Sequence, residues 1–272
     1  MIDAHQHFWN LDEVSYYWMN PGCGSLFRNF VPSDLYPLTV AAGVDRTVVV
    51  QATSSMQETA WLLQQAAEND FIGGVVAWVD LTDPSIQQTL NILVKNPKFK
   101  GVRHQIEDEK DRRWILKPEV LRGLKAVEES GIAFDALLKR DQLWQLQGVL
   151  DACPALRVVI DHCAKPDIAH GGFDEWAEKI DAAAKLPVSC KLSGLFTEAA
   201  PGWTVDDIRP YAEHVLEVFG EDRVMFGSDW PVSTQTADYC RVVESTKALL
   251  AGLSESAIEK IMDGNARRFY KL

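Results

Sequence analysis

The sequence lacks the features that would place the chain in a membrane or in an oxidising compartment. No apolar run approaches the roughly 20 residues that a transmembrane helix requires, and the first residues show no basic segment followed by an apolar one, as a signal peptide would. The five cysteines are odd in number and form no C-x-x-C pair, which indicates reduced thiols rather than a disulfide framework or a zinc ribbon. We therefore expect a cytoplasmic protein that does not bind membranes.

Basic residues are also scarce. The chain has 27 Lys and Arg residues against 39 Asp and Glu residues, for a net charge of -12. Nucleic acids are bound by clustered Lys and Arg side chains that release counterions, so this balance disfavours a nucleic-acid partner. We expect a small-molecule substrate, and the sequence leaves open whether the protein forms a homo-oligomer.

What the chain does contain is a regular alternation of short apolar, β-branched segments with helical patterns, typical of βα units and a parallel sheet. Its length of 272 residues suits one barrel, because such barrels usually have about 250 residues. We predict a single domain over residues 1–272 with an α/β fold of the (β/α)8 TIM type. No glycine-rich turn follows the first strand, which disfavours a Rossmann sheet. The predicted strands are Ile2 to Phe8, Arg46 to Gln51, Ile72 to Val79, Lys100 to His104, Ile132 to Leu137, Leu156 to Asp161, Val188 to Leu192 and Arg223 to Ser228.

Helical patterns separate these strands, and several begin after Ser, Thr or Asp with an early proline, which are typical start signals. Two further helices follow the eighth strand, so the order of elements closes as eight βα units. The predicted helices are Met56 to Asn69, Pro84 to Lys95, Pro118 to Ser130, Asp141 to Ala152, Phe173 to Lys185, Val205 to Phe219, Ala237 to Ala251 and Glu255 to Asp263.

The connection after the first strand, from Trp9 to Pro32, is long for a compact domain. Loops longer than about 12–15 residues are usually functional or disordered, and this one is too aromatic to be disordered. We interpret it as a lid or pocket wall in which Trp9 and Trp18 stack on a substrate. The alternative is a hydrophobic plug that seals one end of the barrel.

His5 and His7 are two residues apart on the first predicted strand, so both imidazoles share one face, which in a closed barrel is the interior. Unpaired imidazoles are costly to bury and require a metal, a carboxylate or a substrate oxygen as partner. An isolated H-x-H pair is a weak motif. Because His and Asp residues also end later strands, we favour a catalytic cluster at the barrel mouth.

Three later strand ends supply further candidates. Asp229, after the eighth strand, is our candidate general base, although an aspartate in this position also serves as a helix cap or turn residue. His162, at the sixth strand, is a second catalytic candidate or a satisfied core histidine. Arg103 and His104, at the fourth strand, form an oxyanion-stabilising pair, or else Arg103 pairs with the acidic residues 107–109.

Lysines are usually solvated, but Lys191 lies within the apolar seventh strand, where solvent is scarce. We predict that its ammonium group faces the substrate. The role of Lys165 stays open, and His170 and His214, in a loop and a helix, receive no role.

Six motifs in order along the chain resemble the amidohydrolase-2 branch of the amidohydrolase superfamily, and within it the sugar-lactonase group that includes L-fuconolactonase and L-rhamnonolactonase. The ending Gly264 to Tyr270 is also similar to that group. The similarity runs over the whole chain, and six ordered motifs are far more specific than one. They are Ile2 to Trp9, Gly74 to Asp80, Lys100 to His104, Asp161 to Pro166, Cys190 to Gly194 and Phe226 to Pro231.

The resemblance implies a deformed (β/α)8 barrel that hydrolyses aldonolactones, with Asp229 activating water and His5, His7 and His162 around the scissile group. One departure is visible, because the metal-binding pattern of the superfamily places a histidine at the end of strand five, where this chain reads Ala133 to Leu137. His5, His7 and Asp229 then offer three protein ligands, the number that a catalytic zinc site needs beside an open position. The branch also includes metal-independent lactonases. We expect either no required cofactor or one divalent cation such as Zn²⁺.

Our hypothesis is a hydrolase that opens a small lactone by base-activated attack of water on the carbonyl. The alternatives are a metal-dependent decarboxylase or amide hydrolase on the same barrel, and a non-catalytic barrel that binds a small molecule. The residues predicted to bind the substrate are Arg103, His104, Lys191, Gln51, Trp9, Trp18 and Trp230.

Overall fold

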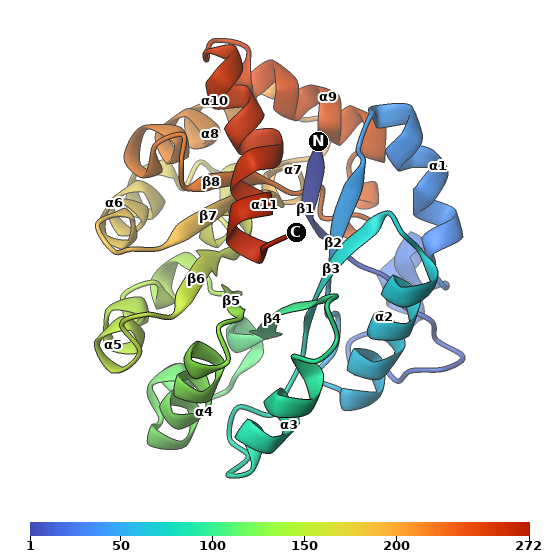
Figure 1. The fold of residues 1–272 in the computed structure, drawn as a ribbon. Helices are drawn as coiled ribbons and strands as arrows, with labels where there is room; N and C mark the ends of the chain where they lie inside the picture. The colour runs from blue at the N-terminus through green and yellow to red at the C-terminus, as the bar shows by residue number, and fades with distance from the viewer.

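Eight parallel strands in sequential order form the centre of the molecule, in a computed structural model that describes residues 1–272. Each strand pairs with the next one along the chain, and the helices surround the strands (Figure 1). The predicted (β/α)8 barrel is therefore confirmed. The strands are β1 (Ile2–Gln6), β2 (Arg46–Val50), β3 (Ile72–Ala77), β4 (Phe99–His104), β5 (Ala133–Ala136), β6 (Arg157–Ile160), β7 (Ser189–Leu192) and β8 (Val224–Phe226).

The predicted helices are present, with small shifts at their ends. Residues 140–142 form a 3-10 turn, so the fifth helix begins four residues later than predicted, at Gln145. The last predicted helix is α-helical only to Glu259 and is followed by a π-helical turn, Lys260–Gly264. A further α-helix begins at Asn265. None of the helices is both long and apolar enough to span a membrane. The helices that were not predicted are α1 (Pro32–Ala42), α7 (Leu195–Glu198) and α11 (Asn265–Tyr270). The predicted ones are α2 (Met56–Glu68), α3 (Ile86–Leu93), α4 (Pro118–Glu129), α5 (Gln145–Ala152), α6 (Phe173–Ala184), α8 (Val205–Phe219), α9 (Tyr239–Leu250) and α10 (Glu255–Glu259).

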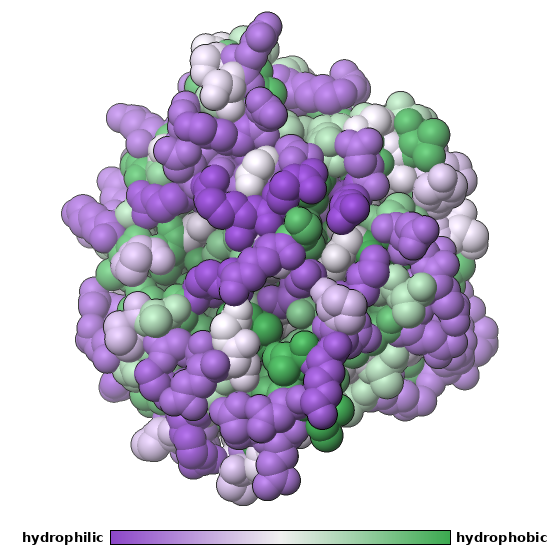
Figure 2. Space-filling view, in the orientation of Figure 1, coloured by the Kyte–Doolittle hydropathy of each residue, from purple (hydrophilic) through white to green (hydrophobic).

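Both chain termini lie at one end of the barrel, where α11 crosses the ring of strands (Figure 1). Ala266 and Tyr270 of α11 pack in a small inner core with Ile2, Ala4 and apolar residues of five other strands. Hydrophilic side chains cover much of this face of the molecule (Figure 2). Because α11 closes this end by packing, the barrel is open to a ligand only at the opposite end, where the strands finish.

Strands β1 and β8 meet through single backbone hydrogen bonds rather than a regular ladder. The amide of Asp229 donates to the carbonyl of His5 at 2.8 Å. Beside this junction, the carboxylate of Asp3 accepts hydrogen bonds from the amide and the hydroxyl of Ser228, at 2.9 and 2.6 Å. The closure of the barrel therefore positions the backbone that carries Asp229.

Candidate active site

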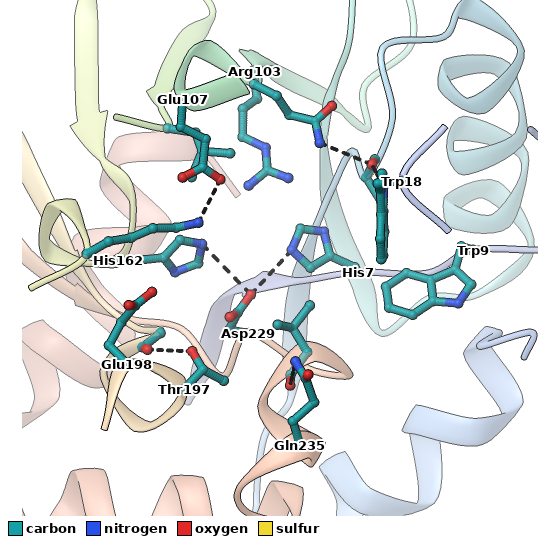
Figure 3. A pocket seen from close by; sticks show the side chains of 16 residues that line it. His7, Trp9, Trp18, Arg103, Glu107, His162, Thr197, Glu198, Asp229 and Gln235 are labelled. Atoms are coloured by element: carbon teal, nitrogen blue, oxygen red, sulfur yellow. Dashed lines mark hydrogen bonds and ion pairs between the residues drawn. The ribbon is translucent and has the colours of Figure 1, made fainter. Parts of the chain in front are cut away.

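The carboxyl ends of the strands surround a cavity of about 330 Å³, within the range of small-molecule sites. Its wall comes from the ends of β1, β4, β6 and β8 and from the loops that follow the strands (Figure 3). The structure brings six of the predicted site residues together around this cavity: His7, Trp9, Trp18, Arg103, His162 and Asp229.

The long connection after β1 forms one wall of this cavity. The indole nitrogen of Trp18 donates to the carbonyl of Ala52 at 2.7 Å, and Trp9 packs edge-on against Trp18. The hydroxyl of Tyr17 donates to the carboxylate of Asp108, on the loop after β4, at 2.8 Å. These contacts tie the connection to two other loops of the barrel mouth, so it acts as a pocket wall, as one of the two interpretations predicted.

A register irregularity in β1 turns both histidines of the H-x-H pair toward the site. Ile2 and Ala4 face the inner core, so strict alternation from Ala4 would point Gln6 inward and His5 outward. The pairing of β1 with β2 shifts between Asp3 and Gln6, which adds one residue and reverses the alternation. The Nε2 atoms of His5 and His7 consequently lie 3.2 Å apart. His5 is fully buried below the cavity, and His7 lines it.

The hydrogen-bond partners of His7 define its protonation. Its Nδ1 lies 2.7 Å from the carbonyl oxygen of Val50, so Nδ1 carries the hydrogen and Nε2 presents a lone pair. Burial lowers the pKa of His7, so the ring is neutral at neutral pH. Its Nε2 nevertheless lies 3.4 Å from Oδ1 of Asp229. Two acceptors thus face each other, an arrangement that a bound cation or a water donor would stabilise.

Three imidazoles surround the carboxylate of Asp229. Its Oδ1 lies 3.4 Å from Nε2 of His7 and 3.8 Å from Nε2 of His162 (Figure 3). Nε2 of His5, below the cavity, is also 3.8 Å away. Burial alone would raise the pKa of Asp229, but the surrounding imidazoles, His162 foremost, favour the carboxylate when they are protonated, and the net pKa lies below its usual range. Burial lowers the pKa of His162 to about 4. At neutral pH Asp229 is therefore ionised beside neutral histidines, and it can accept a proton.

Arg103 supplies a fixed cation at the cavity floor. Its Nη1 lies 3.3 Å from Oδ2 of Asp161 and 3.4 Å from Nε2 of His5, and its Nη2 donates to the carbonyl of Gln51. The alternative that Arg103 pairs with residues 107–109 is wrong, because its carboxylate partner is Asp161. A guanidinium held in this way is suited to stabilise an oxygen that gains negative charge.

Two residues predicted to bind the substrate lie behind the cavity wall instead. Gln51 is fully buried, and its side-chain amide donates to the carbonyl of Arg103 at 3.3 Å. Trp230 is 2% exposed and packs edge-on against Phe30. Contrary to the expectation from the sequence, neither side chain lines the cavity, because both are used in packing.

His104 also lies away from the cavity, contrary to its predicted role. Its Nε2 lies 2.7 Å from Oε1 of Glu109, its Nδ1 accepts a hydrogen bond from the indole of Trp78 at 3.1 Å, and its ring stacks on Trp114. Both ring nitrogens and one ring face are occupied. His104 therefore has no group left for a substrate, and it does not form an oxyanion-stabilising pair with Arg103.

Lys191 was predicted to face the substrate, but the structure places its side chain outside the lining of the cavity. The side chain is fully buried beneath the site, with Nζ at 2.5 Å from Asp135 and at 3.0 Å from both Asp161 and Nδ1 of His5. The hydroxyl of Tyr270 also donates to Asp135, at 2.8 Å. Two carboxylates inside the barrel require a cation, and Lys191 provides it. It reaches the cavity only indirectly, through His5 and through Asp161, which pairs with Arg103.

Comparisons with known proteins identify the family. The amidohydrolase family profile matches residues 2–272. The chain belongs to the amidohydrolase family. It is 38% identical over 276 residues to an L-fucono-1,5-lactonase of Burkholderia ambifaria, covering 100% of this chain and 95% of that protein. It is 34% identical to an L-fucono-1,5-lactonase of Burkholderia multivorans, covering 100% and 96%.

Solved structures agree with this assignment. A crystal structure of an amidohydrolase from Burkholderia multivorans with bound zinc superimposes with a TM-score of 0.94 at 33% identity, covering 100% of this chain and 99% of that one. The resemblance inferred from the six sequence motifs is confirmed.

The loop after β6 carries backbone strain in this amidohydrolase. Four consecutive residues, His162 to Lys165, have positive φ angles of 52°, 50°, 58° and 54°. Such conformations cost a non-glycine residue about 1 kcal/mol or more each. Gly194, with a φ of 69°, packs so closely that a Cβ there would lie 2.7 Å from the ring of His162. Both features hold His162 at the cavity, and the turn also brings Lys165 there.

Sequence reasoning missed the part of the cavity formed by Glu107, Lys165 and Glu198, which we call the charged wall. Glu107 was considered only as a partner of Arg103, and Lys165 was left open. Each follows a strand of the barrel within a few residues, and this position is the signal that could have identified them. Thr197 and Gln235 also line the cavity and were not predicted.

His5, His7 and Asp229 form a donor set that suits a divalent cation. Ligand atoms about 2.0–2.2 Å from a tetrahedral metal lie roughly 3.2–3.6 Å from one another. The three separations here are 3.2, 3.4 and 3.8 Å, so two fall in this range and the third is slightly longer. Asp135, at the strand-five position, is not in the set because it pairs with Lys191.

Proposed function

We propose that this amidohydrolase hydrolyses a small lactone, and specifically a sugar aldonolactone of the L-fucono- or L-rhamnono- type. The observation that carries the proposal is the carboxyl group of Asp229, which lies with His7 and His162 at the floor of a cavity of small-molecule size. Full-length similarity to two L-fucono-1,5-lactonases supports the choice of substrate class.

In the proposed reaction Asp229 accepts a proton from water while the water oxygen attacks the lactone carbonyl. A carboxylate with a low pKa is a weak base, so the carbonyl must be activated as well. Arg103 donates to the carbonyl oxygen as it gains negative charge. Ring opening then breaks the bond between the carbonyl carbon and the ring oxygen. Asp229 transfers its proton to Nε2 of His162, which lies 3.8 Å from its Oδ1. His162 then donates this proton to the departing oxygen, which completes the hydroxy acid.

His5, His7 and Asp229 would hold a divalent cation such as Zn²⁺, and the zinc-bound structure of the Burkholderia multivorans amidohydrolase supports this assignment. When bound, such a cation polarises the carbonyl or lowers the pKa of a coordinated water. The hydrogen bond from Nδ1 of His7 to Val50 orients Nε2 toward the donor set.

Removal and return of zinc tests this donor set. We expect chelated protein to take up about one Zn²⁺ per chain, and to gain about 2.7 kcal/mol of stability at a free Zn²⁺ concentration of 100 Kd. The His7→Ala variant should lose both effects. The His170→Ala variant is the matched control, because His170 is 81% exposed and outside the site. Metal content is measured by mass spectrometry and stability by thermal unfolding. Equal zinc uptake by wild type and His7→Ala would show that another group binds the metal.

The function is tested by a pH-indicator assay with L-fucono-, L-rhamnono-, L-galactono- and D-arabinonolactones, because ring opening releases a proton. We expect rapid hydrolysis of one or two of them. A flat response across the panel would overturn the proposal. Release of CO₂ from aromatic carboxylates would then indicate a decarboxylase, and ligand-induced stabilisation without any product would indicate a binding barrel.

A further inference from the structure

The cavity has two unlike sides. Glu107 and Glu198 lie on one side of Asp229, and the indoles of Trp9 and Trp18 lie on the other (Figure 3). The charged wall contains two carboxyl groups and the ammonium of Lys165, whereas the indole nitrogens of the Trp side are already bonded to backbone carbonyls. A ligand at Asp229 therefore meets hydrogen-bonding groups on one edge and aromatic carbon on the other.

The ammonium group of Lys165 has N–H donors that no residue of the protein accepts. Its Nζ donates to Oε1 of Glu107 at 2.6 Å, and this is the only polar contact of the ammonium group. The Lys165 side chain is 25% exposed and lines the cavity. An ammonium group has three N–H donors, so two remain for a ligand. The bond to Glu107, whose own side chain is mostly buried, holds the lysine in place at the cavity.

The carboxyl oxygens of Glu198 have no hydrogen-bond donor from the protein. It lies at the end of α7, it lines the cavity, and its carboxyl group makes no hydrogen bond or ion pair with another residue. Burial raises the pKa of Glu198, and Lys165 acts in the opposite direction. A partly buried carboxyl group without a partner is unfavourable, and a hydroxyl group of a ligand would satisfy it.

We propose that Lys165 and Glu198 bind the hydroxyl groups of a polyhydroxylated lactone and thereby determine which lactone the enzyme accepts, while Glu107 positions Lys165. This inference rests on the proposed lactonase function. The pair contains one donor group and one acceptor group, which match the two hydrogen-bonding capacities of a sugar hydroxyl. A site built to bond substrate hydroxyls rejects analogues that lack them, because its polar groups are then left without partners.

The test compares two substrates of the same ring size. One is the best 1,5-aldonolactone of the panel, and the other is δ-valerolactone, which carries no hydroxyl groups. Lys165→Met and Glu198→Met keep the length of the side chains and remove their polar groups. We expect each variant to lose roughly 10- to 100-fold in kcat/KM on the sugar lactone, the effect of a hydrogen bond to a charged group. The loss on δ-valerolactone should be much smaller, and Lys165→Arg should restore part of the sugar activity.

The positioning role of Glu107 has its own readout. Glu107→Gln should lower kcat/KM on the sugar lactone, and it should cause little further loss when Lys165→Met is already present. Full additivity of the two substitutions would overturn this role. The matched controls are Lys185→Met, at the residue that follows α6, and Glu217→Gln, on α8; both side chains are exposed and make no hydrogen bond or ion pair.

The remaining outcomes are distinguishable. Equal losses on both lactones, or no loss on either, would overturn specificity by the charged wall. A wild-type enzyme that opens δ-valerolactone as efficiently as the sugar lactone would overturn it as well. A wild-type enzyme that opens neither lactone would overturn the proposed function, and this inference with it.

Discussion

The Asp229→Asn variant is expected to lose about 10³-fold in kcat/KM on the lactone substrate, because general-base catalysis contributes typically 10²- to 10⁴-fold. Asparagine keeps the size of the side chain and an oxygen near Nε2 of His7, but it cannot take a proton from water. The measurement is the initial rate of proton release, corrected for the spontaneous hydrolysis of the lactone.

Two controls separate catalysis from folding in this experiment. Thermal unfolding of Asp229→Asn should remain cooperative, since the backbone of residue 229 is held by the β1–β8 junction and not by its carboxylate. Asp151→Asn, on the outer face of α5, should behave as wild type. Full turnover by a folded Asp229→Asn protein would refute the role of Asp229 as the base.

The Lys191→Met variant is expected to lose about 3–5 kcal/mol of unfolding free energy, the usual consequence of removing one partner from a buried ion pair. Asp135 and Asp161 are fully buried with Lys191, and both would lose their ammonium partner. For a chain of this length the loss corresponds to a decrease in Tm of about 5–10 °C. Denaturant unfolding, monitored by tryptophan fluorescence, gives the free energy directly.

A second substitution checks this explanation. Without Lys191, Asp161 keeps Arg103 as a partner but Asp135 has no cation left. Adding Asp135→Asn to Lys191→Met removes that unpaired carboxylate, so the double variant should recover part of the lost stability. Lys95→Met, an exposed lysine beyond the end of α3, is the control and should change stability by less than about 0.5 kcal/mol. A Lys191→Met protein as stable as wild type would show that the buried carboxylates do not depend on this lysine.

The elements of the barrel were predictable because their signals are local. A strand such as β2 is a short run of valines, and a helix such as α2 begins at Ser55 with a side-chain cap, so a window of ten residues contains the information. Three helices escaped prediction: α1, the four-residue α7 and the last helix, α11. The ends of elements were less certain, since they depend on turns such as the one at residues 140–142.

The candidate site was predictable only in part. His7, His162 and Asp229 were found because the mouth of a barrel collects the residues that end its strands. Lys191 satisfied the same rule and was misassigned, because its position on the strand places it below the cavity. Its partner Asp135 is 56 residues away in sequence, and no local pattern indicates that the two meet.

The fold class, the family and the strand ends that line the cavity could be inferred from the sequence alone, because hydrophobic periodicity and ordered motifs act over short stretches of chain. Only the tertiary structure decided which polar residues reach the cavity, because burial and pairing depend on groups from distant strands. The register shift in β1 that turns His5 inward, and the bond between Glu107 and Lys165, 58 residues apart, are of this kind. Both arise only when the barrel closes and brings the strand ends together.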